Sequence, residues 1–333
     1  MKGNTLPVLT VVVVIIALWY AACLPMNIRE VLTEAERAGA VLEPPSPLER
    51  RDASTWALIY NNLAYTGESW SQERPRLPAP HQVAVELWQS TWVEEVHGRR
   101  GIVQSCSAVF EAGFTLETAL QSCTFSNRSL VYHGGVTLIA TFVGFLMGTG
   151  LGILLAVGIV HSRTMDRSVM PWAIVSQTIP IVAIAPMIIV VLYSVGVQGL
   201  LPKAIISAYL SFFPVVVGMV KGLRSPDAMQ MDLLHTYGAT KAQGLWKLRL
   251  PASVPYLFAS LKIGISASLV GAIVGELPVQ KGGIGARLLA GSYYGQTAQI
   301  WAALFTAALL AAALVTIITR IERRTLRRMG VAA

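Results

Sequence analysis

The sequence predicts an all-α integral membrane protein with about six transmembrane helices. Of its 333 residues, 54% are hydrophobic and only 13% are charged, and the mean hydropathy is +0.57. This composition is typical of integral membrane proteins rather than of soluble domains. Several apolar stretches are long enough to cross a bilayer core, which takes about 20 helical residues. They are residues 6–24, 131–161, 169–195, 202–223, 256–279 and 296–321.

The basic residues predict how these spans are oriented, because Lys and Arg concentrate in short cytoplasmic loops. The net charge is +8. Basic residues gather between spans two and three, around residues 221–262 and from residue 320 onward, whereas the loops on the other side carry only Lys203, Lys281 and Arg287. Both termini and the loop between spans four and five are therefore expected in the cytoplasm. A nucleic-acid surface would interleave aromatic residues with these bases, so membrane orientation is the better interpretation.

The spans divide the chain into four predicted regions. Residues 1–24 form an N-terminal transmembrane anchor, residues 25–130 an external (periplasmic) insertion, residues 131–322 the membrane core and residues 323–333 a basic cytoplasmic tail. The anchor ends in Tyr20-Ala21-Ala22-Cys23, which loosely resembles a lipoprotein cleavage box. Because the apolar run is long enough to span a bilayer, a retained anchor is favoured over a cleaved signal peptide.

The external insertion is polar and rich in acidic residues. Apolar faces at residues 54–63 and 82–96 predict short helices and hence a small helical cap. Proline-rich patches at residues 43–48 and 74–80 favour the alternative, a partly disordered linker.

Two cysteines, Cys106 and Cys123, fall in this insertion. A disulfide between them would persist in an oxidising compartment, and two free thiols are the alternative.

A polar, basic segment at residues 225–255 lies between spans four and five, where a bare loop would suffice. Ser225 is expected to cap a first short helix, and Gly238 to supply the left-handed residue that ends it. Thr240 is expected to cap a second helix, and Pro251, which lacks a backbone donor, to stop or kink it. The segment is therefore predicted to be a helical hairpin. The alternative to a specific role is that this hairpin merely joins the two spans.

The spacing within this hairpin is similar to that of the EAA loop of ABC importer membrane subunits. Gly238 follows Asp232 by six residues, Leu248 follows Gly238 by ten, and Leu250-Pro251 closes the segment. On these residues the chain resembles the permease family of binding-protein-dependent transporters.

The resemblance covers most of residues 131–333. The segments at residues 176–186 and 210–217 also resemble the nitrate, sulfonate and taurine branch of that family. The hairpin departs from the family's pattern at two places: Asp232 replaces the usual Glu, and Leu233-Leu234 replace the paired alanines.

The resemblance implies a coupling helix that sits in a cleft of a separate ATP-hydrolysing subunit. The residues expected to couple to that ATPase are Asp232, Leu233, Leu234, Tyr237, Gly238, Ala239, Leu248, Leu250 and Pro251. The implied partners are two ABC ATPase subunits, an external solute-binding protein and a second permease copy in a homodimer, in the inner membrane of a bacterium. ATP and Mg²⁺ are expected on the partner subunit and no cofactor on this chain, which has no GxxxxGK[ST] loop.

The resemblance also limits the chemical class of the solute. The branch handles small oxyanions, sulfonates and heterocyclic vitamin precursors, and the sequence does not choose among them. Nor does it decide whether the insertion docks the binding protein, covers the path or binds another subunit.

Residues expected on the translocation path or its gate lie in span three and around the end of span five. Polar and proline residues interrupt span three, and Glu276 is the acid placed within a span, where charge is costly unless water or a base is near. The residues are Gln177, Pro180, Pro186, Glu276, Gly283 and Gly285. The alternatives are a packing kink in span three and an interfacial acid paired with Lys281 or Arg287.

No catalytic or metal-binding set competes with this interpretation. The five histidines fall in separate segments, without HExxH or CxxC pairing. The chain is thus predicted to be a transport subunit and not an enzyme. Two other classes stay open: a membrane receptor or scaffold that signals through the hairpin, and a passive channel. Neither needs an ATPase partner.

Overall fold

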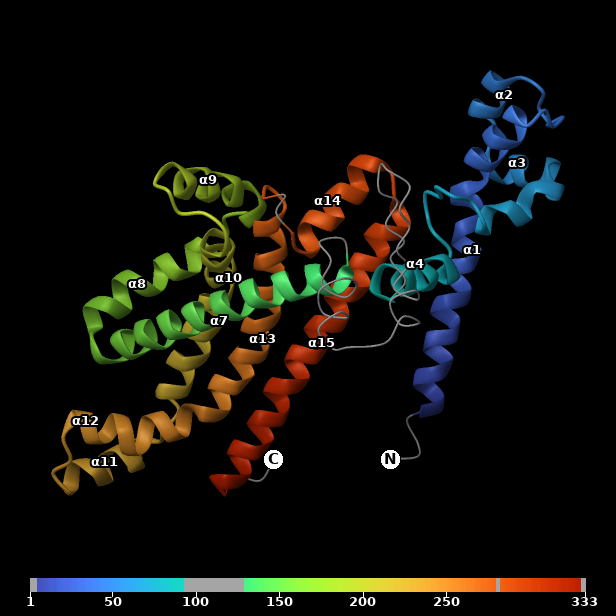
Figure 1. The fold of residues 1–333 in the computed structure, drawn as a ribbon. Coiled ribbons are helices and arrows are strands. Elements are labelled where there is room, and N and C mark those ends of the chain that lie inside the picture. Colours follow the sequence, from blue (N-terminus) through green and yellow to red (C-terminus); the bar gives the residue numbers. More distant parts are fainter. Residues whose placement is uncertain (1–4, 93–128, 280–281, 331–333) are drawn as a thin grey trace, which may run out of the picture. The chain divides into compact units, whose positions relative to one another are not determined.

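The computed structural model describes residues 5–92, 129–279 and 282–330, which form helices and turns without a β-strand among them (Figure 1). They fall into two compact units. Residues 1–130 with residues 287–305 form the N-terminal unit, and residues 131–286 with residues 306–333 form the core unit. The predicted cysteine pair, Cys106 and Cys123, lies outside the described residues.

The predicted membrane fold is confirmed. Among the described residues, five helices are long and apolar enough to cross a membrane, and a bent pair would make a sixth crossing. The five contain α1 (Thr5–Arg37), α7 (Leu130–His161), α10 (Leu200–Leu223), α13 (Leu250–Glu276) and α15 (Thr297–Arg328). Each covers most of one predicted apolar stretch.

Helix α1 does not end where the apolar run ends at residue 24. It continues through Pro25 to Arg37. The continuation has its own apolar face, because Ile28, Leu32 and Ala35 recur at helical spacing and are buried against Leu58 and its neighbour in α3 (Thr55–Asn61). The anchor and the start of the insertion are therefore one helix.

The rest of the insertion packs around this helix. It contains α2 (Pro47–Asp52), α3, the 3₁₀ segment η1 (Leu63–Trp70) and α4 (Pro80–Trp92), so that helices occur at both predicted helical patches. Asn27, which is fully buried, donates from Nδ2 to the carbonyls of Ser69 (2.9 Å) and Leu77 (2.8 Å) and accepts from the Leu77 amide (3.0 Å).

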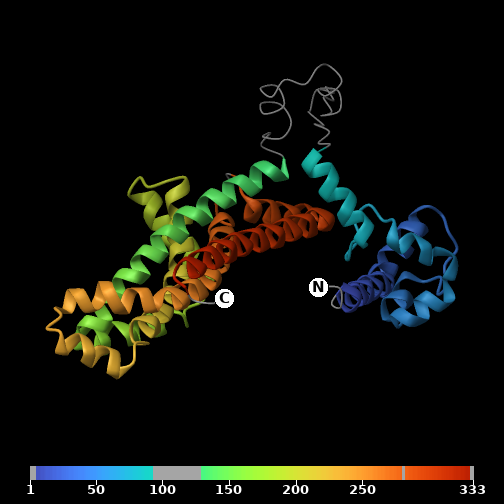
Figure 2. The ribbon, with the colours of Figure 1, turned by 90° about the horizontal axis from the view of Figure 1, so that it is seen from below.

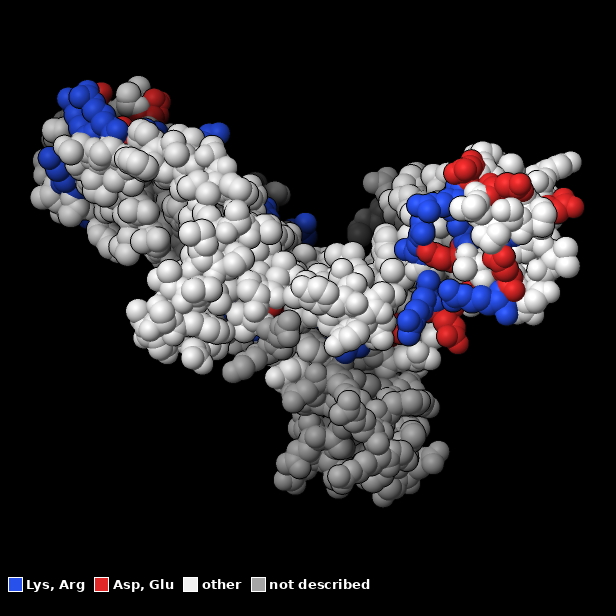
Figure 3. All heavy atoms as spheres, turned by 90° about the horizontal axis from the view of Figure 1, so that it is seen from above, with Lys and Arg blue, Asp and Glu red and all other residues white. Residues whose placement is uncertain are grey.

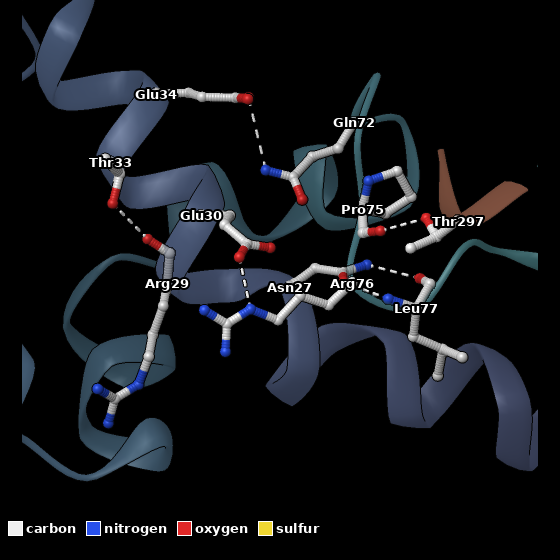
Figure 4. Close-up of polar contacts among 10 residues, drawn as sticks. All are labelled: Asn27, Arg29, Glu30, Thr33, Glu34, Gln72, Pro75, Arg76, Leu77 and Thr297. Atoms are coloured by element: carbon white, nitrogen blue, oxygen red, sulfur yellow. Dashed lines mark hydrogen bonds and ion pairs between the residues drawn. The ribbon is translucent and has the colours of Figure 1, made fainter. Parts of the chain in front are cut away.

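The segment between η1 and α4 has further contacts with α1 and with the first residue of α15 (Thr297–Arg328) (Figure 4). Arg76 forms an ion pair with Glu30, and the Thr297 hydroxyl donates to the Pro75 carbonyl. These residues form part of a folded subdomain, including the proline-rich patch at residues 74–80.

The core unit is built on close packing of α7, α10 and α13. A Cβ added to Gly144 or Gly148 of α7 would overlap with Ser207 or Ser211 of α10, and one added to Gly271 of α13 would lie 2.7 Å from the Ser207 Cα. Glycine lets the helix backbones approach this closely. The order of these contacts along the helices shows that α7 runs parallel to α10 and that α13 runs antiparallel to both.

Hydroxyl groups complete this seam. Ser207 donates to the Ser268 carbonyl (2.8 Å), and Ser268 donates to the Thr141 carbonyl (2.9 Å), so that one chain of hydrogen bonds joins all three helices. The glycines of α7 and α13 and the serines of α10 and α13 are thus used for packing within one chain.

The predicted third span is broken. It consists of α8 (Arg163–Ser176) and α9 (Ile181–Ser194), which meet at an angle of 101° (Figures 1 and 2). Pro180 has no amide hydrogen to continue the helix, and Thr178 donates its hydroxyl back to the Val175 carbonyl (2.8 Å). The Tyr209 hydroxyl of α10 donates to the Ser176 carbonyl, which the break leaves without a helical partner. The prediction of one continuous helical span at residues 169–195 was therefore wrong, because two helices with a sharp bend occupy this stretch.

Candidate functional site

The predicted helical hairpin is present as α11 (Ala228–Thr236), α12 (Lys241–Gly244) and a π-helical segment η2 (Leu245–Arg249) that leads into α13. Figures 1 and 2 show α11 and α12 at the end of the core unit away from α9. Gly238 has φ +64°, and its amide donates to the His235 carbonyl (3.0 Å). It ends the first helix as the sequence predicts.

The caps differ in part from the prediction. Thr240 caps α12, and its hydroxyl accepts from the Gln243 amide (3.2 Å). Ser225 does not cap α11, because its hydroxyl donates to the Gly222 carbonyl of α10 (2.8 Å). Asp227 takes the capping position instead and forms a capping box with Gln230.

Of the two outcomes expected for Pro251, a stop or a kink, the stop does not occur. The five-residue π segment precedes it, and α13 continues from Leu250 to Glu276. A proline ring in an α-helix collides with the carbonyl four residues earlier, and a π bulge relieves such a clash. The hairpin is consequently joined to the membrane helix α13 by continuous helical backbone.

The hairpin has two faces. Met229 (79% exposed) and Leu233 (57%), four residues apart on α11, define its outer face. Tyr237 (80%) and Trp246 (71%) are further exposed apolar side chains of the hairpin. Such a patch on a polar hairpin is typical of a protein contact surface. Asp232, Gly238 and Pro251 are exposed as well.

The other residues assigned to coupling are less exposed. Leu234, Ala239, Leu248 and Leu250 are half-buried, and Leu250 packs against the buried cluster of α7 and α10. The structure therefore brings the nine predicted coupling residues together on one hairpin but divides them between its outer face and its base.

A second constellation lies at the opposite end of α13. Glu276 is fully buried. Its carboxylate accepts from the Thr137 hydroxyl of α7 (2.9 Å) and from the Gly285 amide (2.9 Å) at the start of α14 (Ile284–Tyr294). The Thr137 oxygen in turn accepts from the Ile284 amide (2.9 Å). We call these residues, with His133 and Gly283, the Glu276 cluster.

His133 and the two glycines close the cluster. The Gly283 amide donates to His133 Nδ1 (2.9 Å). Gly283 has φ +112°, and a Cβ there would overlap with the Glu276 carboxylate; a Cβ on Gly285 would overlap with the Ile273 carbonyl. Only glycine fits at these two positions, so the backbone wraps directly around the acid.

The remaining path candidates lie elsewhere. Gln177 and Pro180 are exposed at the α8–α9 bend, and Pro186 is exposed on α9, whose buried face packs Ala185 and Ile189 against Ile206. The structure thus brings together Glu276, Gly283 and Gly285, and it packs α9 against Val274 and Val279 on either side of Glu276. Lys281, an expected partner of Glu276, lies outside the described residues.

Several residues of the site were missed in the sequence. His133 and Thr137 stand four apart on one face of α7, a spacing that could have marked them as a pair. Lys203 is buried and donates to the Gly282 carbonyl (3.0 Å). Lys262 of α13 forms an ion pair with Glu322 of α15 (2.9 Å). Among the described residues, no group of three or more His, Cys, Asp and Glu could hold a metal ion.

Comparison with known proteins identifies the fold's relatives. Residues 148–331, more than half of the chain, match the family model of the binding-protein-dependent transport system inner membrane component. The formylaminopyrimidine transport permease protein ThiX of Halalkalibacterium halodurans is 30% identical over 161 residues, which is 48% of this chain and 63% of that relative.

Two further proteins resemble the chain over longer stretches. The putative aliphatic sulfonates transport permease protein SsuC of Bacillus subtilis is 24% identical over 251 residues, or 75% of this chain and 85% of that one. A chain of the inward-facing MetNI methionine ABC transporter has a TM-score of 0.48 and 22% identity, over 61% of this chain and 94% of its own. The resemblance predicted from the hairpin is confirmed: this chain belongs to the family of binding-protein-dependent transport system inner membrane components, which are membrane transport proteins and not enzymes.

Proposed function

We propose that this chain is the permease subunit of an ATP-driven ABC importer and forms the path of a small solute across the inner membrane. The observation that carries the proposal is the hairpin. It presents exposed apolar side chains at Met229, Leu233, Tyr237 and Trp246, and its backbone runs without interruption into α13. A surface for another protein and a rigid connection to a membrane helix are what transmission of force requires.

The proposed partners are two ABC ATPase subunits that bind ATP and Mg²⁺, a second copy of this permease, and a solute-binding protein outside the cell. This chain itself would bind no cofactor. Both termini and the hairpin would face the cytoplasm, where the basic residues are concentrated. Figure 3 shows Lys and Arg gathered at the end of the core unit that carries α11 and α12.

The packing of the core unit supports a mechanical role for the hairpin. It connects α10 to α13, and these helices pack closely against each other along their length. Arg224 at the end of α10 also pairs with Asp166 of α8 (2.9 Å). Closure of the ATPase dimer would move the hairpin and with it α10, α13 and the start of α8, which biases the unit toward one of two arrangements.

The Glu276 cluster would serve as a structural gate element at the outer end of this assembly. It ties α7, α13 and α14 to one another through a buried carboxylate rather than leaving that charge for a solute. The exposed residues Gln177, Pro180 and Pro186 at the α8–α9 bend remain the candidates for the path itself.

The solute would be a small oxyanion, a sulfonate or a heterocyclic vitamin precursor. Relatives named for formylaminopyrimidine and for aliphatic sulfonates support this range. Two of the three lysines in α10 and α13 have other partners: Lys203 donates to Gly282, and Lys262 pairs with Glu322. The third, Lys221, is exposed in the last turn of α10. Selectivity for an anion would therefore reside largely in the binding protein.

The proposal is tested by purifying the full chain from its native membrane in mild detergent and identifying its stoichiometric partners by mass spectrometry. A P-loop ATPase in a 1:1 ratio with the permease is the expected result. A complex without an ATPase would overturn the proposal and would favour a membrane receptor that signals through the hairpin.

A further inference from the structure

A pocket of about 290 Å³ lies between the end of α7 and the hairpin. Val160 and His161 of α7 form one wall, and Leu234, His235, Lys241 and Arg249 of the hairpin are among the residues of the other. The pocket is therefore located where the apolar part of α7 ends and the polar hairpin begins.

The pocket lies on the inner face of the hairpin and not on its outer apolar face. On helix α11, Met231, Leu234 and His235 line the pocket, whereas Met229 and Leu233 project from the opposite side. An ATPase bound to the outer face would leave the pocket open to another ligand.

The charged residues that line the pocket are all basic. Lys241 and Arg249 are the charged residues among those that line it, and no Asp or Glu lines the pocket. No ion pair among the described residues includes Lys241 or Arg249. Neighbouring like charges repel, and an anion between them would relieve the repulsion and accept hydrogen bonds from both.

His161 is held against the end of α7 by its ring. Its Nδ1 lies 2.8 Å from the Val157 carbonyl, and because a carbonyl only accepts, Nδ1 carries the proton.

We propose that this pocket binds a phosphate-type oxyanion. The ligand would bridge the end of α7 and the hairpin and so hold the hairpin in a defined position against the core. The phosphate can belong to the headgroup of an anionic phospholipid or be free in solution. The apolar wall formed by Val160 and Leu234, at the end of a membrane helix, favours the lipid. A lipid bound here would lie in the inner leaflet, and only this placement rests on the orientation proposed above.

The test measures ligand binding to the delipidated full chain in detergent by native mass spectrometry, without an ATPase present. The probes are dioleoylphosphatidylglycerol, its zwitterionic counterpart dioleoylphosphatidylcholine, and inorganic phosphate. The pocket variant carries Lys241→Gln and Arg249→Gln. The matched control carries Lys221→Gln and Lys247→Gln, which remove the same charge from exposed positions outside the pocket. A third variant, Lys241→Arg with Arg249→Lys, keeps the charge.

We expect phosphatidylglycerol to bind in preference to phosphatidylcholine, and to bind the pocket variant about tenfold more weakly, since two charge-assisted hydrogen bonds are lost. The control and the charge-preserving variant should bind within about threefold of the unmodified chain, because exposed charges contribute little. Binding of inorganic phosphate with the same loss, in the absence of lipid binding, would support the site with a free anion as its ligand. Equal losses in the pocket variant and the control, or no loss in either, would overturn the proposal.

Because the assay contains no ATPase and no solute, its outcome is independent of whether the chain drives import. A failure here would leave the importer proposal standing, and a failure to find an ATPase partner would leave the anion site standing.

Discussion

The Thr137 hydroxyl of α7 donates to the Glu276 carboxylate of α13 at 2.9 Å, across 139 residues of sequence. The same oxygen accepts from the Ile284 amide, and the same carboxylate accepts from the Gly285 amide. One buried pair thus organises the junction of three helices. A buried carboxylate is tolerable only when its oxygens are hydrogen-bonded, so each member of the Glu276 cluster depends on the others.

Thr137→Val is expected to destabilise the core unit. The substitution keeps the shape of the side chain but removes a donor to Glu276 and an acceptor for Ile284, and each buried polar group left unsatisfied costs about 1–3 kcal/mol. Thermal unfolding of the detergent-solubilised chain measures the loss. Thr316→Val is the matched control, because the Thr316 hydroxyl is exposed and donates only to the Ala312 carbonyl of its own helix. Equal melting temperatures for the two variants would contradict the role given to Thr137.

Gly283→Ala is expected to prevent the turn between α13 and α14 from folding around the Glu276 carboxylate. The added Cβ would collide with the Glu276 carboxylate, and alanine is also strained at φ +112°. Gly295→Ala separates the two effects, because Gly295 has φ +66° but no atom within 4 Å of an added Cβ. The control should lose only about 1 kcal/mol from backbone strain. Folded protein yield and melting temperature are the measurements. If both variants behave alike, backbone strain explains the result and the close approach to Glu276 has no consequence.

Gly238→Pro is expected to uncouple transport from ATP hydrolysis while the core unit stays folded. Proline fixes φ near −65°, which is incompatible with the +64° observed, and removes the amide that donates to His235. Uptake into vesicles and ATP hydrolysis by the whole complex should separate. Gly330→Pro removes an equivalent amide at φ +73° in the tail and should leave uptake intact. Normal uptake by the Gly238 variant would rule out a mechanical role for this turn.

Asn27→Ala is expected to loosen the insertion without unfolding the core unit. The buried side chain makes three hydrogen bonds to the segment that includes Ser69 and Leu77, so its loss leaves backbone groups unsatisfied at about 1–3 kcal/mol each. Hydrogen exchange should accelerate in residues 69–79 and remain slow in α10. Asn61→Ala, at an exposed position of α3, is the control. Unchanged exchange in residues 69–79 would mean that other contacts hold this segment.

Hydropathy and turn chemistry predicted the membrane helices and the hairpin, because these features are local. The left-handed Gly238 and the Thr240 cap follow from neighbouring residues alone. Tertiary partners decided the rest. Ile28 and Leu32 extend α1 past the apolar run because Leu58 covers them. The Tyr209 hydroxyl donates to the Ser176 carbonyl, at the break in the third span.

The Glu276 cluster shows the same limit. The glycines after the fifth span could be recognised in the sequence, but Thr137 and His133 come from a helix far away in the chain. The spacing of His133 and Thr137 marks them as neighbours on α7, but nothing near them in the sequence indicates that they meet Glu276. The cap of α11 was missed for a different, local reason: the Ser225 hydroxyl donates to the Gly222 carbonyl three residues earlier, and Asp227 caps the helix.

The central claim, that the outer face of the hairpin binds an ATPase, is tested most directly by site-specific photo-crosslinking in native membranes. Tyr237 on the hairpin is 80% exposed and Tyr60 in the insertion is 78% exposed, so replacing each in turn with p-benzoylphenylalanine gives matched probes. We predict that irradiation links position 237, but not position 60, to a P-loop ATPase identified by mass spectrometry. Absence of an ATPase adduct at position 237, with the chain inserted and folded, would contradict the account.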